Sequence, residues 1–479
     1  MPLPTKVEIA KETYRVYKTG IPFYDAARLI GVAHLFLGTA SAEVEDRGLY
    51  WEVYGLKVAR DPIQIEWVLE DGKAKAGDLR QKEDQLRKAL KAGLPKEFEG
   101  LPSTAESYPA LKEFDACLQR GPRGFDPLRD WRIVCSLKTP KLKEKVFSLS
   151  SHELVVSSVG FSFSASVRSG EYRTFILPVF RGRFVLSGFL IYQRNFYHAA
   201  SGFVAEVLAS LSILLDLANR RLPVADFVYT RVFGRNVFSS SGYLGLERLC
   251  IYWWEAIQRG KHDALNLLRN FRLFLQNTQS SNIDEQVQNL ARWVADFIAN
   301  PNVNALTKIE QLKARILASS QADSIRGGDA AKGLLGRSEQ VKEVKVMLQP
   351  NLPEVPWQVS EALAWALGFD EKGWMNQFTR LENAPNFPQF IQQVERIISR
   401  GYYREQQEEG GQPNIQQALT KARNMANILR GMDSALQDEK TFRAWKAIFL
   451  LDVLSRAQMK TEASPEQAGE EETQTTEEG

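Results

Sequence analysis

The chain has 479 residues, 44% of them hydrophobic and 25% charged, a balance typical of a soluble globular protein. This length is sufficient for two to four domains. The formal net charge is +3, but seven acids and no bases follow Lys460, so residues 1–460 carry +10. A nucleic acid is therefore the first partner to consider.

Cysteine, histidine and hydropathy patterns exclude several classes of protein. The three cysteines lie far apart: Cys117, Cys135 and Cys250. This spacing indicates buried thiols in a reducing compartment, and no histidine clusters with them, so neither zinc nor another cofactor is expected. Glu206 and Asp216 interrupt the most apolar run, residues 202–221, which predicts a buried helix and no membrane span. With no apolar leader at the start, we expect a cytoplasmic protein.

The first elements in chain order are a helix and a pair of strands. Apolar residues at helical spacing predict a helix over residues 22–38, with His34 packed on its apolar face and not catalytic. Two strands should follow, joined by a turn at residues 46–48. Residues 78–93 have the pattern of a charged, exposed helix.

The clearest strand signal lies between residues 152 and 193. There, apolar side chains alternate with serines at Phe161, Phe163, Ala165 and Val167. Residues 168–171 and 181–183 have turn composition, so we predict an antiparallel β-meander. The buried helix at 202–218 should pack on the apolar face of this sheet.

From residue 243 onward the pattern is helical. A polar, glycine-bearing stretch at residues 319–340 interrupts it and is predicted to be a linker. Four helices are expected after it: 357–368, 386–400, 413–430 and 438–458. The acidic residues after these helices are poor in apolar side chains, which predicts disorder.

The predicted fold class is α+β, with an N-terminal mixed domain that contains the β-meander and a largely helical C-terminal half that ends in a helical bundle. The predicted domains are a mixed α/β nucleic-acid-binding domain at 1–242, a helical segment packed on it at 243–318, a linker at 319–340, a helical bundle at 341–458 and a disordered acidic tail at 459–479.

Catalytic motifs are not found. The stretch GGDAAKGLLGRS at residues 327–338 lacks the Gly-Lys-Ser/Thr order of a P-loop, and there is no G-x-S-x-G or H-E-x-x-H motif. The protein is therefore predicted not to be an enzyme. Two alternatives remain open: a nucleic-acid-processing enzyme whose acidic site the linear sequence does not reveal, and a helical scaffold whose charge only keeps it soluble.

Arginine is concentrated between residues 160 and 240, where nine arginines, no lysine and four acids occur. Aromatic residues are interleaved with them, as in YQRNFYH and YTRVFGRNVF, and guanidinium groups match phosphates, base edges and aromatic rings. The DNA-binding candidates are Arg168, Arg173, Arg181, Arg183, Arg194, Asn195, Arg231, Arg235 and Asn236. A second basic run offers phosphate-backbone candidates: Lys138, Lys141, Lys143 and Lys145. The alternative is that both are charged surfaces without a ligand.

Residues 19–55, TGIPFYDAARLIGVAHLFLGTASAEVEDRGLYWEVYG, resemble the amino-terminal segment of large subunits of type I CRISPR Cascade complexes. The resemblance covers this segment and the overall layout. It implies a non-catalytic subunit that contacts the 5′ end of the crRNA and the backbone subunits and recognises a protospacer-adjacent motif in target double-stranded DNA. It also implies recruitment of the helicase-nuclease effector, while guide pairing specifies the remaining sequence.

The same resemblance implies that the C-terminal bundle is similar to the small subunit and lines the path of a DNA strand. Some related genes produce that bundle separately, so a product of residues 347–479 from an internal start at Met347 is a testable hypothesis, although Val codons can also initiate. For recognition of the motif, composition favours loop residues near Arg181, Arg183, Asn195, Arg231, Arg235 and Asn236, since Arg and Asn can reach base edges.

Overall fold

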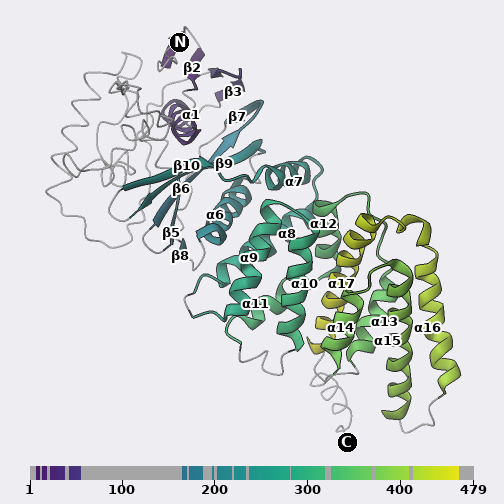
Figure 1. The fold of residues 1–479 in the computed structure, drawn as a ribbon. Helices are drawn as coiled ribbons and strands as arrows, with labels where there is room; N and C mark the ends of the chain where they lie inside the picture. The colour runs from purple at the N-terminus through teal and green to yellow at the C-terminus, as the bar shows by residue number, and fades with distance from the viewer. Residues whose placement is uncertain are drawn as a thin grey trace, which may run out of the picture. The chain divides into compact units, whose positions relative to one another are not determined.

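The computed structural model shows how the predicted elements assemble (Figure 1). It describes residues 7–10, 13–18, 22–37, 42–54, 164–169, 172–186, 197–198, 202–217, 221–233, 237–280, 282–318, 325–368, 373–408 and 414–462. The chain divides into two compact units. The sheet unit comprises the chain up to Lys261 together with Gln279–Ser281, and the helical unit comprises His262–Thr278 and the chain from Asn282 onward.

The sheet unit contains two five-stranded sheets within the described residues. Sheet A has the order β1 (Val7–Ala10), β2 (Thr13–Tyr17), β4 (Tyr50–Tyr54), β3 (Ala42–Asp46) and β7 (Arg183–Leu186). Sheet B has the order β10 (Val237–Tyr243), β9 (Val224–Phe233), β6 (Tyr172–Phe180), β5 (Ala165–Ser169) and β8 (Tyr197–His198). Neighbouring strands are antiparallel except β5 and β8, which pair in parallel.

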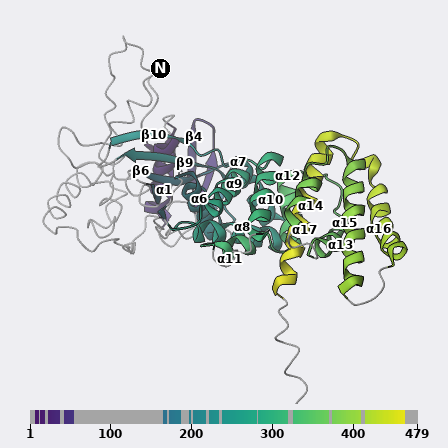
Figure 2. The same ribbon diagram turned by 60° about the horizontal axis from the view of Figure 1, so that its bottom comes forward.

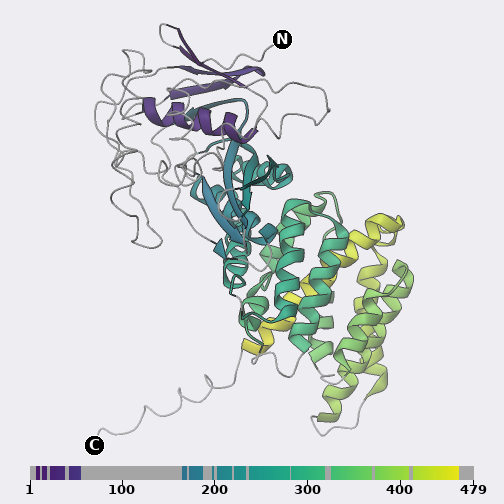
Figure 3. The same cartoon turned by 60° about the vertical axis from the view of Figure 1, so that its left-hand side comes forward.

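Two helices form the core of the sheet unit with these strands. Helix α1 (Pro22–Leu37) contacts strands of both sheets (Figure 3). Every side chain from Phe23 to Ile30 is buried. Helix α6 (Gly202–Leu217) packs on β5 and β6. The structure confirms both predicted helices. The hydroxyls of Ser210 and Ser212 donate to main-chain carbonyls one turn earlier, which satisfies these polar groups inside an apolar helix.

The predicted turn at residues 46–48 connects β3 and β4 as expected. Asp46 Oδ1 accepts hydrogen bonds from Gly48 N at 2.9 Å and from Lys18 Nζ at 2.7 Å. Gly48 has a φ of +79°, a conformation that glycine adopts without the steric cost of a Cβ. The hairpin is confirmed. The helix predicted at residues 78–93 lies outside the described residues.

The predicted β-meander is correct for its first hairpin and wrong for its second. β5 and β6 pair as expected, with Ala165 and Val167 buried, whereas Phe161 and Phe163 lie outside the described residues. At residues 181–183 the chain leaves sheet B, and β7 pairs with β3 of sheet A. Phe184 therefore enters the core, 5% exposed, with its ring centroid 5.1 Å from that of Phe180. A linear pattern of turns does not specify this change of partner strand.

The helical unit is built from α8 to α17 (Figure 2). Its helices are α8 (His262–Asn277), α9 (Glu285–Ala299), α10 (Val303–Ala318), α11 (Gly328–Gly333), α12 (Ser338–Leu348), α13 (Trp357–Gly368), α14 (Trp374–Glu382), α15 (Phe387–Glu408), α16 (Ile415–Arg430) and α17 (Glu439–Glu462). The four predicted bundle helices correspond to α13, α15, α16 and α17. Helix α17 packs against α10, α12 and α13, and Trp445 contacts Phe387, Phe390 and Phe449 edge-on or stacked.

Several predicted segments have a different internal structure from the one expected. Helix α7 (Glu247–Gln258) packs on β9 and belongs to the sheet unit, while α8 belongs to the helical unit.

The predicted linker at residues 319–340 contains α11 and the start of α12. Met347 lies inside α12, so a product beginning there would lack the buried Val341 and Val344. Helix α17 continues to Glu462, past the predicted start of disorder at residue 459, and residues 463–479 lie outside the described residues.

Helices α13 and α15 approach closely at Gly401. A Cβ at this position would lie 2.6 Å from Ala366 Cβ and 2.8 Å from Ala366 Cα, closer than van der Waals contact permits. We expect Gly401→Ala to lower the free energy of unfolding by about 1–3 kcal/mol, because overpacking outweighs the better helix propensity of alanine. Urea unfolding measures the change. Gly368→Ala is the control, since nothing lies within 4 Å of a Cβ there, and an equal loss in both variants would contradict the packing argument.

Candidate nucleic-acid interface

The structure describes only some of the predicted DNA-binding residues. Those outside the described residues are Arg194, Asn195, Arg235, Asn236, Lys138, Lys141, Lys143 and Lys145. Arg173 lies in β6, and its side chain is also not described. Arg168, Arg181, Arg183 and Arg231 remain, all in the sheet unit.

The exposed arginines among these candidates do not gather at one point. Arg168 in β5 lies opposite Arg173, near the start of β6, and its side chain is exposed. Arg181 follows the other end of β6, about 26 Å along the strand direction. Arg183 is exposed and forms an ion pair with Glu43 of β3, and this hydrogen bond lowers the pKa of the Glu43 carboxyl. These side chains offer separate cations and not a single cluster.

Arg231 has a structural role that sequence analysis did not anticipate. It lies within β9, not in a loop, and its Nη2 is 2.5 Å from Glu206 Oε1 of α6. Glu206 is 4% exposed and also accepts a hydrogen bond from Thr174 Oγ1 at 2.9 Å, while Arg231 Nε contacts that same hydroxyl at 3.3 Å. The guanidinium thus neutralises a buried carboxylate between sheet B and α6. The prediction that Arg231 belongs to a motif-reading loop is wrong about its position, because the residue lies within a strand.

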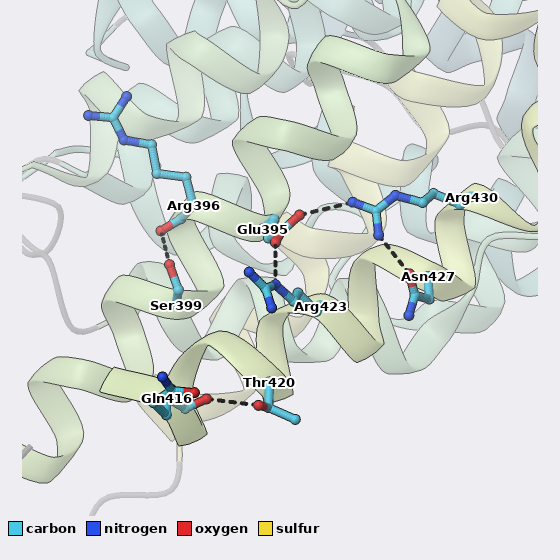
Figure 4. Close-up of polar contacts among 8 residues, drawn as sticks. All are labelled: Glu395, Arg396, Ser399, Gln416, Thr420, Arg423, Asn427 and Arg430. Atoms are coloured by element: carbon cyan, nitrogen blue, oxygen red, sulfur yellow. Dashed lines mark hydrogen bonds and ion pairs between the residues drawn. The ribbon is translucent and has the colours of Figure 1, made fainter. Parts of the chain in front are cut away.

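A second polar surface lies on the antiparallel helices α15 and α16 of the helical unit. We call it the α15–α16 face and define it by the eight residues in Figure 4: Glu395, Arg396, Ser399, Gln416, Thr420, Arg423, Asn427 and Arg430. The α16 members recur at intervals of four and three residues, which places them on one side of that helix. The face contains three arginines and one acid.

Glu395 organises the centre of the α15–α16 face. Its carboxylate lies 3.1 Å from Arg430 Nη2 and 3.8 Å from Arg423 Nε, so one acid holds two guanidinium groups (Figure 4). Asn427 Oδ1 accepts a further hydrogen bond from Arg430 Nη1 at 2.6 Å. Arg396 points away from the other members, into open space in this view. Arg423 and Arg430 are thus oriented by neighbours, and three arginines against one glutamate leave the face positively charged.

Helix α16 is unusual in composition. It has three cations, five side-chain amides or hydroxyls and no acid. Only a narrow stripe is buried: Ala418, Ala422, Ala426 and Leu429. On its other flank, Lys421 Nζ lies 4.4 Å from the centre of the Tyr402 ring of α15. The exposed surface of the helix is thus mainly polar and free of negative charge, although Ile415, Leu419 and Ile428 are also exposed on it.

This arrangement suits a phosphate backbone. Guanidinium forks and side-chain amides are common donors to phosphate oxygens, and an acid-free helix does not repel them. Sequence analysis missed the face because it searched for high arginine density, which occurs at residues 160–240. The available signal was the recurrence of Gln416, Thr420, Arg423, Asn427 and Arg430 on one side of a helix without an acid.

The described part of the chain offers no alternative metal centre, since it contains no group of three or more His, Cys, Asp or Glu side chains placed to hold an ion. No helix described in either unit combines the length and apolarity needed to cross a bilayer. Comparisons of the chain with protein-family models, with curated proteins and with solved structures found no match.

Proposed function

We propose that this chain is a nucleic-acid-binding protein that acts without catalysis as the large subunit of a type I Cascade-like, RNA-guided DNA surveillance complex. Its ligands would be the crRNA and target double-stranded DNA. Its protein partners would be the backbone, guide 5′-end and small subunits and the helicase-nuclease effector.

The observation that carries the nucleic-acid part of this proposal is the α15–α16 face. Three arginines and four amide or hydroxyl side chains share this face with a single glutamate, which pairs with Arg423 and Arg430, and α16 has no acid of its own. Each guanidinium can neutralise one phosphate and release a counterion. The exposed Arg168, Arg181 and Arg183 of the sheet unit add separate cations that suit contacts with duplex DNA.

The assignment to an RNA-guided complex depends on the resemblance of residues 19–55. In the structure this segment contributes α1 and the β3–β4 hairpin, whose buried side chains are part of the core of the sheet unit. Expression of the chain with its neighbouring genes tests the assignment, because we expect a short guide RNA to co-purify. Purification without RNA or partner subunits under those conditions would contradict the assignment and leave nucleic-acid binding as a separate question.

We expect the triple variant Arg396→Gln, Arg423→Gln and Arg430→Gln to bind nucleic acid roughly 10- to 100-fold more weakly at moderate salt. Fluorescence anisotropy with labelled single-stranded and duplex DNA, repeated over a range of salt concentrations, measures this loss. If the arginines contact phosphates, the slope of log affinity against log salt should fall in magnitude by roughly 2 to 3, since each lost phosphate contact removes about 0.7–0.9.

A matched control keeps the net charge equal. Arg269, Arg292 and Arg443 are exposed arginines of the same unit that lie outside the α15–α16 face. Their replacement by glutamine should change the affinity and the salt slope much less than the triple variant does. Equal losses in the two triple variants would show that net charge, and not this face, determines binding.

A further inference from the structure

The chain beyond α17 has the opposite charge to the α15–α16 face. Residues 463–479 contain six glutamates and no lysine or arginine: Glu466, Glu470, Glu471, Glu472, Glu477 and Glu478. The face carries three arginines against the single Glu395. Carboxylates are good partners for guanidinium groups, which they can engage with two parallel hydrogen bonds. We call residues 463–479 the acidic segment.

The acidic segment is attached within reach of this face. Helices α17 and α15 touch near their starts, where Trp445 packs against Phe387 and Phe390. Helix α13 packs against α17, α15 and α16, so farther along α17 at most two helix-to-helix spacings, roughly 20 Å in total, separate it from the α15–α16 pair. Helices α16 and α17 run in opposite directions, so the end of α17 lies at the same end of the unit as the start of α16 (Figure 1). Arg423 is eight residues, or about 12 Å, along α16 from that end. Seventeen residues can span up to about 58 Å.

We infer that the acidic segment binds the α15–α16 face of its own chain and competes there with nucleic acid. Each exposed ion pair contributes only about 0–1 kcal/mol, so no single contact would hold the segment in place. The tether compensates, because a short linker raises the effective concentration of the glutamates to the millimolar range. Several weak pairs can then keep the face occupied at low salt.

The regulatory consequence, unlike the contact itself, rests on the proposed function. A polyanion that occupies the arginines raises the apparent dissociation constant of every phosphate ligand that needs them. The effect should be greatest for weakly held, non-specific nucleic acid, because a ligand fixed by further contacts displaces the segment more easily. The acidic segment would thus favour correctly assembled ligands over random nucleic acid.

Fluorescence resonance energy transfer between two dyes on the full chain tests the contact between the acidic segment and the α15–α16 face, with no nucleic acid present. Dyes would be attached to Asn424→Cys on exposed α16 and to Thr475→Cys in the acidic segment, with Cys117 and Cys135 replaced by serine and the buried Cys250 retained. We expect efficient transfer at about 50 mM salt and a marked loss by about 500 mM, because screening weakens exposed ion pairs. Replacement of the six glutamates by glutamine should abolish the salt-sensitive part, whereas replacement by aspartate should retain it.

Binding assays then test the competition. We expect the six-glutamine variant to bind labelled DNA roughly 3- to 10-fold more tightly than the unmodified chain at low salt, with little difference at high salt. On the background of the Arg396, Arg423 and Arg430 triple variant, the same change should have little effect.

The outcomes separate the two proposals. Salt-sensitive transfer with no DNA binding would support the contact and contradict the proposed function. If the chain binds DNA but the energy transfer is the same in the unmodified chain and the six-glutamine variant, the proposed contact is wrong. A third outcome is that the six-glutamine change tightens DNA binding as much in the triple-arginine variant as in the unmodified chain. That result would show general charge repulsion and would overturn the inference.

Discussion

Replacement of Lys313 by methionine is expected to stabilise the helical unit by about 2–4 kcal/mol at neutral pH. Lys313 lies on α10, is 0% exposed, and donates a hydrogen bond from Nζ to the carbonyl of Leu334. Burial lowers its pKa from 10.5 to about 7, a change that corresponds to a cost on the order of 5 kcal/mol. Methionine removes that cost, but it leaves the Leu334 carbonyl without this donor, which costs about 1–3 kcal/mol.

The pH dependence gives this prediction a definite sign. Between about pH 7 and 10.5 the unfolded chain keeps the Lys313 proton while the folded chain loses it. The unfolded state therefore binds more protons in this window, and the free energy of unfolding rises with pH through it. The stabilisation by Lys313→Met should accordingly be greatest below pH 7 and shrink as the pH rises toward 10. Urea unfolding at several pH values measures the difference between the two proteins.

Lys308→Met is the matched control. Lys308 lies on the same helix but is exposed, so its replacement should change the free energy of unfolding by at most about 0.5 kcal/mol at any of these pH values. Burial also lowers the pKa of Lys446, but this group titrates in every variant, and its effect cancels in the difference. A Lys313→Met protein that is less stable than the unmodified chain below pH 7 would contradict the prediction.

The helices of the C-terminal half could be predicted closely from local patterns. The predicted helix 357–368 matches α13 at both ends, and α16 begins two residues after its predicted start. The start of α16 is fixed by Asn414, whose side chain accepts a hydrogen bond from Gln417 N. Such signals lie within one turn of the residue that they specify, which makes them visible in a single sequence.

Strand pairing was harder to predict because it depends on contacts between distant segments. β9 and β10 were not predicted as strands: β9 mixes apolar residues with Asp226, Thr230 and Arg231 and lacks a clear alternation. β7 pairs with β3, 140 residues away, where Glu43 lies opposite Val185. A turn at Gly182 shows that the chain changes direction but does not show which strand it joins.

The two arginine-bearing regions illustrate the same distinction for the candidate site. Arginine density directed attention to residues 160–240, yet one of those arginines, Arg231, neutralises a buried acid. Charge composition alone does not distinguish an arginine that binds a ligand from one that stabilises the fold. The α15–α16 face has fewer arginines, but helical spacing puts Arg423 and Arg430 on one side of α16, a helix without acids.

Replacement of Arg231 by alanine is expected to lower the free energy of unfolding of the sheet unit by about 2–4 kcal/mol, below the full cost for a wholly buried pair because the arginine side chain is 32% exposed. The loss would arise mainly from Glu206, which would remain buried without its cation and keep the hydrogen bond from the Thr174 hydroxyl of sheet B. Urea unfolding followed by circular dichroism measures the change. Arg168→Ala, at an exposed arginine of the same sheet, should cost less than about 0.5 kcal/mol.

A second substitution distinguishes a structural arginine from one whose main role is to bind DNA. Glu206→Gln removes the buried charge, so the double variant with Arg231→Ala should be more stable than Arg231→Ala alone, with a coupling energy of about 1–3 kcal/mol. If Arg231 served the ligand alone, Glu206→Gln would not restore stability, and Arg231→Ala would weaken DNA binding without altering the unfolding curve. We expect the opposite pattern, because the guanidinium lies 2.5 Å from a carboxylate that is almost fully enclosed. Within the arginine-rich segment, Arg231 is therefore expected to stabilise the packing of sheet B on α6.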